Sequence, residues 1–78
     1  MMDPALRTLI ARAVNAPESE IDDDSTWQTI GTWDSFAEVA IAANLDRQYG
    51  IELSAADAER LTSVREIRAV LAERGVIV

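Results

Sequence analysis

Apolar residues recur three or four positions apart in several stretches of this chain, and this spacing constrains its fold more than any other feature. In an α-helix such a spacing gathers apolar side chains on one face, which a protein buries. The clearest stretch spans residues 64–71, where the apolar positions are Val64, Ile67, Val70 and Leu71. The pattern predicts a helical protein.

Residues that favour helix ends set the limits of the first two helices. The first helix is predicted over Asp3–Val14, because Asp3 is a good N-cap and Pro4 suits a first turn. The second is predicted over Ser35–Tyr49, where Gly50 supplies a stop. Between them lies a long loop, and a loop of that length in so small a domain is usually functional or disordered. Its apolar residues favour a packed loop, with four expected anchors: Ile21, Trp27, Ile30 and Trp33.

Two further helices are predicted in the second half of the chain. Ser54-Ala-Ala-Asp57 is a capping pattern for a short helix, and Thr62 or Ser63 would cap a longer one that ends before Gly75. Residues 51–53 could form a short extended piece but have no obvious strand partner. The predicted fold class is therefore all-α: a small four-helix bundle of three main helices and one short helix, with a long loop between helices one and two. Residues 1–78 are expected to form a single domain.

Negative charge is concentrated in one part of the chain. The net charge is −7, and residues 18–38 hold acidic residues without a single basic one. Such a field repels nucleic acid and anionic membranes and attracts basic protein surfaces, unless these acids only aid solubility. There is no apolar run near the roughly 18 residues of a membrane span, and no signal peptide pattern. A cytoplasmic protein is expected.

Several kinds of chemistry are excluded by missing residues. The chain has no His and no Cys, so a Ser-His-Asp triad and thiolate metal sites are impossible. Asp22, Asp23 and Asp24 suggest a calcium loop, but Trp27 and Trp33 stand where that loop needs Gly and Glu. We therefore expect no metal site and no enzyme activity.

Ser35 is the residue whose role the pattern leaves open. With Glu38 three positions later it matches a capping box, in which Ser accepts a hydrogen bond from the third helical amide. The motif alone would make Ser35 structural. It stands, however, within Gly31-x-x-Asp34-Ser35-Phe36, after a long loop and at the start of a helix. Together with Tyr49-Gly50-Ile51 and Leu61-Thr-Ser-Val64, this run makes nearly the whole chain resemble the acyl carrier proteins.

The resemblance implies a cofactor and a function. In that family the serine, here Ser35, is esterified to 4′-phosphopantetheine by a phosphopantetheinyl transferase that uses coenzyme A. The thiol of this arm carries an acyl or aminoacyl thioester between enzymes. Asp34 would assist the modification, or only help to cap the helix. The expected partners are the transferase and the acyl- or aminoacyl-loading and transferring enzymes with basic docking surfaces, and the protein is expected to be a monomer. The alternative is a non-covalent helical interaction module that keeps the fold without the arm.

The sequence also departs from the fatty-acid carriers, which hold acids along the second helix. Ala37, Ala40 and Arg47 stand where acids are common, which favours a dedicated pathway such as polyketide, nonribosomal peptide or glycan acylation. A second apolar stripe runs beside the core face and either packs onto the loop or contacts partners. The residues expected to bind partners are Phe36, Val39, Ala43, Glu38, Asp22, Asp23 and Asp24.

Overall fold

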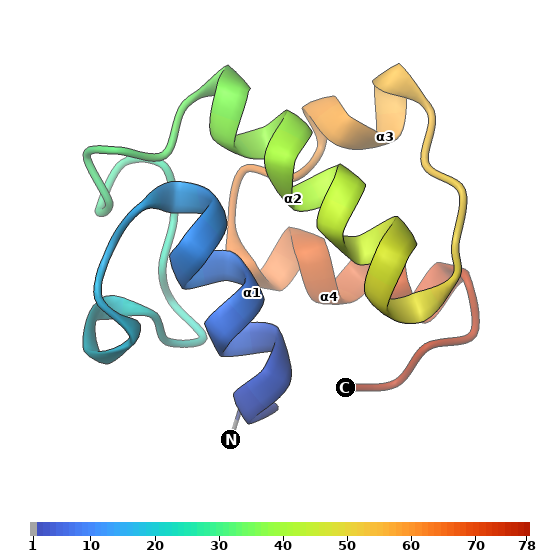
Figure 1. Ribbon diagram of the computed structural model, residues 1–78, viewed down its shortest axis with the longest axis horizontal. Helices are drawn as coiled ribbons and strands as arrows, with labels where there is room; N and C mark the ends of the chain where they lie inside the picture. Colours follow the sequence, from blue (N-terminus) through green and yellow to red (C-terminus); the bar gives the residue numbers. More distant parts are fainter. Residues whose placement is uncertain (1) are drawn as a thin grey trace.

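The computed structural model describes residues 2–78 and shows a helical protein (Figure 1). Its helices are α1 (Pro4–Val14), α2 (Ser35–Tyr49), α3 (Ala55–Glu59) and α4 (Val64–Glu73), with a short 3-10 turn, η1 (Glu18–Glu20), in the loop after α1. The described residues form no strand, and their one bridge of β type joins Thr26 to Ser63. The predicted fold class is confirmed; η1 was not predicted.

The four helices enclose one core. α1 lies beside α2, α4 crosses behind α2 in this view, and α3 lies near the first half of α2 (Figure 1). Each long helix contributes one apolar row, as its spacing predicts. The side chains with no exposed surface are Leu6, Ile10, Ile41, Leu45, Leu61, Val64, Ile67, Val70 and Leu71. Within the described chain, no helix combines the length and apolarity needed to cross a bilayer.

Side-chain caps begin α1, α3 and α4 where the sequence predicts them. Asp3 accepts a hydrogen bond from the Leu6 amide at 3.1 Å, and Ser54 and Asp57 form the complete capping box of α3. Ser63, rather than Thr62, caps α4 by accepting from the Glu66 amide at 3.0 Å. For α2 the sequence leaves Asp34 and Ser35 open as caps, and the first turn of this helix contains the functional candidate.

The long loop is packed, but not on all four expected anchors. Ile21, Ile30 and Trp33 are buried, and the Trp33 indole donates to the Leu61 carbonyl at 2.9 Å. The prediction for Trp27 is wrong, because its side chain is 53% exposed. The backbone of Trp27, rather than its side chain, attaches the loop to the rest of the protein, because its amide donates to the Thr62 carbonyl at 3.0 Å.

Candidate functional site

The first turn of α2 is capped by Asp34, not by Ser35. The Asp34 carboxylate accepts a hydrogen bond from the Ala37 amide at 2.9 Å, and Ser35 is the first residue with helical geometry. The Ser35–Glu38 capping box, one of the two roles that the sequence leaves open for Ser35, is therefore not formed. Asp34 and Ser35 are both good N-cap residues, and the chain enters the helix one residue earlier than that motif requires.

Because Asp34 caps the helix, the Ser35 side chain is not needed as a cap. Ser35 is exposed, and no hydrogen-bond partner of its hydroxyl lies among the described residues. The amides of Ser35 and Phe36 belong to the group at a helix start that has no partner within the helix. An exposed hydroxyl beside such amides suits a phosphodiester, because the helix dipole favours negative charge there. The residues present fit an attached phosphopantetheine group.

Carboxylates gather around this end of α2. The pKa of Glu38 is raised from its ordinary value, first by partial burial and then by the negative charges of Asp34 and Glu59. Glu59 comes from the end of α3, and no motif in the sequence marks it as part of the site. Its nearness depends on how α3 packs against α2, which no local pattern reveals.

The second apolar stripe of α2 does not pack onto the loop. Phe36 is 84% exposed, Val39 is 62% exposed, and Ala43 is also exposed. We call these three residues the outer strip. Ala37, by contrast, is buried against the core, so its lack of charge follows from packing and says nothing about partners.

The acidic loop is tied to α4 by ion pairs. Asp23 contacts Arg68 at 2.9 Å and Asp24 contacts Arg65 at 2.7 Å, while Asp22 accepts from the Asp24 amide at 2.8 Å. The arginines that balance these acids come more than forty positions later in the chain, so no local pattern predicts the pairing. The three acids stay near the surface, but two of them already have partners.

Comparison with known families agrees with this geometry. A helical bundle with an exposed, uncommitted serine at the start of its second helix has the architecture of a carrier domain. The family model described as "Phosphopantetheine attachment site" matches residues 4–71, and the chain therefore belongs to this phosphopantetheine-binding family of carrier proteins. Members carry a covalently attached 4′-phosphopantetheine group and are non-catalytic carriers. Among curated proteins, no significant match to the sequence is found.

Proposed function

We propose that residues 1–78 form one carrier domain that holds acyl or aminoacyl thioesters on a 4′-phosphopantetheine arm attached to Ser35. The assignment rests on the exposed hydroxyl of Ser35 at the start of α2. This hydroxyl is free because Asp34, and not Ser35, caps the helix. The serines with competing tasks support the choice. Ser54 and Ser63 cap helices, and Ser25 is buried and hydrogen-bonded.

The residues around Ser35 would each aid the modification in a distinct way. The first amides of α2 would stabilise the phosphodiester. The exposed position would let a transferase form the bond between the Ser35 oxygen and phosphorus, as the pyrophosphate bond of coenzyme A breaks, adenosine 3′,5′-bisphosphate leaves and the hydroxyl loses its proton. Asp34 holds the helix start in place through the Ala37 amide. Its carboxylate also lies next to the reacting hydroxyl in the chain, where it would assist the transferase.

Partner enzymes would bind two surfaces of the carrier, the outer strip and the acidic loop. The outer strip offers exposed apolar area that a docked partner can bury, and Glu38 adds charge beside it. Asp22, Asp23 and Asp24 would steer basic partners toward the loop. Exposed ion pairs are weak, so a basic partner can compete with Arg65 for Asp24, whose side chain is 80% exposed.

The carrier would serve a dedicated pathway, such as polyketide, nonribosomal peptide or glycan acylation, rather than general fatty-acid synthesis. Support comes from the outward part of α2, where Ala40 and Arg47 replace the acids common in fatty-acid carriers. We place the protein in the cytoplasm, as a monomer, where its transferase would draw on coenzyme A.

The attachment site is tested by intact-mass measurement after incubation with a phosphopantetheinyl transferase and coenzyme A. The wild type should gain one phosphopantetheine, and Ser35→Ala should gain none. Ser54→Ala is the matched control, since it alters another serine at a helix start and should still be modified. Label that persists in Ser35→Ala would refute the assignment. A folded wild type that accepts no label would favour the non-covalent interaction module. The exposed outer strip is also compatible with such a module.

A further inference from the structure

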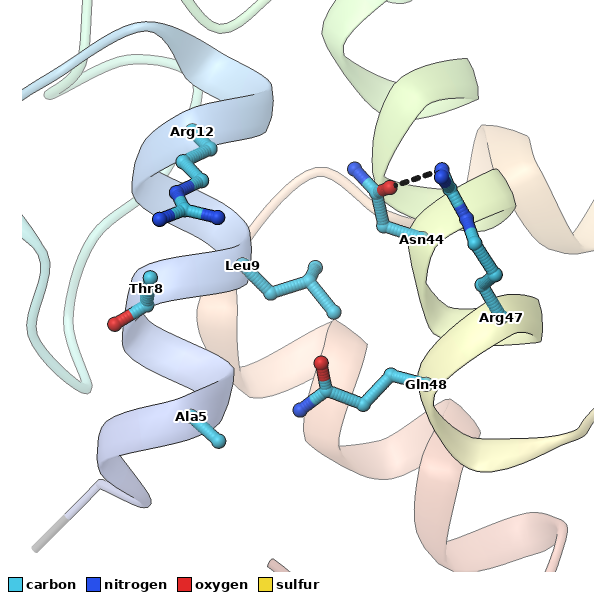
Figure 2. A pocket seen from close by; sticks show the side chains of 7 residues that line it. All are labelled: Ala5, Thr8, Leu9, Arg12, Asn44, Arg47 and Gln48. Atoms are coloured by element: carbon cyan, nitrogen blue, oxygen red, sulfur yellow. Dashed lines mark hydrogen bonds between the residues drawn. The ribbon is translucent and has the colours of Figure 1, made fainter.

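A cleft between α1 and α2 collects basic and amide side chains on an otherwise acidic protein. Its volume is about 340 Å³, within the usual range of small-molecule sites. The lining includes Thr8, Leu9 and Arg12 from α1 and Asn44, Arg47 and Gln48 from α2, and no acidic residue. In Figure 2 Leu9 and Gln48 project into the gap between the two helices, with Arg12 above them on α1.

The arginines of this cleft differ from the four arginines of residues 60–74. Arg60, Arg65, Arg68 and Arg74 each contact an acid within 3.5 Å. Within residues 2–78 no such ion pair involves Arg12 or Arg47, although the chain has twice as many acidic as basic residues. Glu18 lies in the neighbouring hollow beside Arg12, where it accepts a hydrogen bond from the Thr8 hydroxyl at 2.6 Å. The positive charges of Arg12 and Arg47 are therefore not neutralised by ion pairs within residues 2–78.

One hydrogen bond orients the polar groups of α2. Arg47 donates to the Asn44 side-chain oxygen at 2.6 Å, as the dashed line in Figure 2 shows. Because a guanidinium can only donate, the Asn44 oxygen must face Arg47, and its amide nitrogen then faces α1. Arg12, the Asn44 amide nitrogen and the Gln48 amide nitrogen are all donors, and all three residues line the cleft. Such a set of donors is suited to a carboxylate or phosphate oxygen.

The cleft is also within reach of an arm on Ser35. Phe36, Ala40, Ala43 and Arg47 follow one another along one face of α2, from the helix start to the cleft. Arg47 lies twelve residues after Ser35, about 18 Å along the helix axis. A phosphopantetheine arm has as many chain bonds as about five extended residues, so it spans about 17 Å. The group bound to its thiol would therefore arrive at the cleft.

We propose that this cleft binds the terminal carboxylate of a short dicarboxylic acyl group carried on the arm, which makes acidic acyl thioesters the class of cargo. The inference rests on the proposed function, because the acyl group must be attached at Ser35. Exposed ion pairs are weak, and a free carboxylate would bind poorly. Tethering raises the effective concentration of the carboxylate to the millimolar range, which makes a weak site useful.

The test compares two loaded forms that differ only in the terminal group. A phosphopantetheinyl transferase would load the protein from succinyl-coenzyme A or from butyryl-coenzyme A, and intact mass would verify each product. In ¹H–¹⁵N spectra the side-chain amide signals of Asn44 and Gln48 should shift in the succinyl form relative to the butyryl form. The double variant Arg12→Gln/Arg47→Gln should abolish this difference. Arg65→Gln, which alters an arginine of α4 that does not line the cleft, should preserve it.

Each outcome of this experiment is decisive. Identical Asn44 and Gln48 signals in two fully loaded forms would overturn the inference and leave the carrier function intact. Absence of loading, seen by mass, would overturn the carrier function and the inference together. Free succinate at the protein's own concentration should cause no shift; if it reproduced the shifts, the cleft would be a site for free anions and the assignment to cargo would fall.

Discussion

The two faces of α2 carry similar residues and have opposite surroundings. Ala37, Ile41 and Leu45 point into the core, whereas Phe36 and Val39 point into solvent. Both rows are apolar and both follow helical spacing, so hydrophobicity does not separate them. What separates them is which face α1, α3 and α4 cover. The inner row should determine stability and the outer row should determine recognition. Substitutions at Leu45, Asp34 and Phe36 test this division.

The largest effect is expected on the inner face. Leu45 has no exposed surface, so Leu45→Ala should leave a cavity and lower the free energy of unfolding by about 2–5 kcal/mol. Chemical denaturation followed by circular dichroism measures this change. Val39→Ala is the matched control on the outer face and should change stability by no more than about 0.5 kcal/mol. Equal losses in the two variants would end the distinction between the faces.

A smaller effect on stability is expected at Asp34, the N-cap of α2. Asp34→Ala removes the N-cap of α2 and should cost about 0.5–2 kcal/mol, whereas Asp34→Asn keeps a capping oxygen and should cost only a few tenths. The pair separates two roles of Asp34. If Asp34→Asn is as stable as the wild type but is modified more slowly by the transferase, the carboxylate assists the modification. Unchanged modification rates in Asp34→Asn would limit Asp34 to capping.

The smallest effect on stability is expected on the outer strip. Phe36 is exposed, so Phe36→Ala should change the free energy of unfolding by no more than about 0.5 kcal/mol. If the outer strip binds partners, the same substitution should speed dissociation from the cognate transferase, with little dependence on salt. Stopped-flow measurements across a salt series give these rates. A Phe36→Ala variant that unfolds easily but dissociates normally would place Phe36 among the structural residues.

The sequence was informative where structure depends on neighbours in the chain. Helical spacing located the core rows of α1, α2 and α4, and Asp3, Ser54 and Ser63 cap helices as local patterns predict. The start of α2 was ambiguous because Asp34 and Ser35 are adjacent and both cap well. The choice between the two caps matters, because it decides whether the Ser35 hydroxyl has a partner.

Features that depend on distant contacts were beyond the sequence. Trp27 and Trp33 look equivalent in the loop, yet only the Trp33 indole is buried and donates to a carbonyl, that of Leu61, whereas the Trp27 indole is exposed. The pairing of Asp24 with Arg65 and the cleft between α1 and α2 likewise require the helices to be packed. Ser35 itself could be singled out, because length, loop and motif together resemble one family.

The contact between the loop and the start of α4 has a consequence for the order of folding. The Val64 amide, at the first position of α4, donates to the Ser25 carbonyl at 3.0 Å, and the Trp27 amide donates to the Thr62 carbonyl. These hydrogen bonds close the segment between residues 25 and 64. Closing a segment of that length costs conformational entropy before the hydrogen bonds form and compensate for it. The first turn of α4 therefore gains its full set of hydrogen bonds only after the loop has docked. In the folding transition state this turn should be among the last parts to form, later than the locally connected turns of α2.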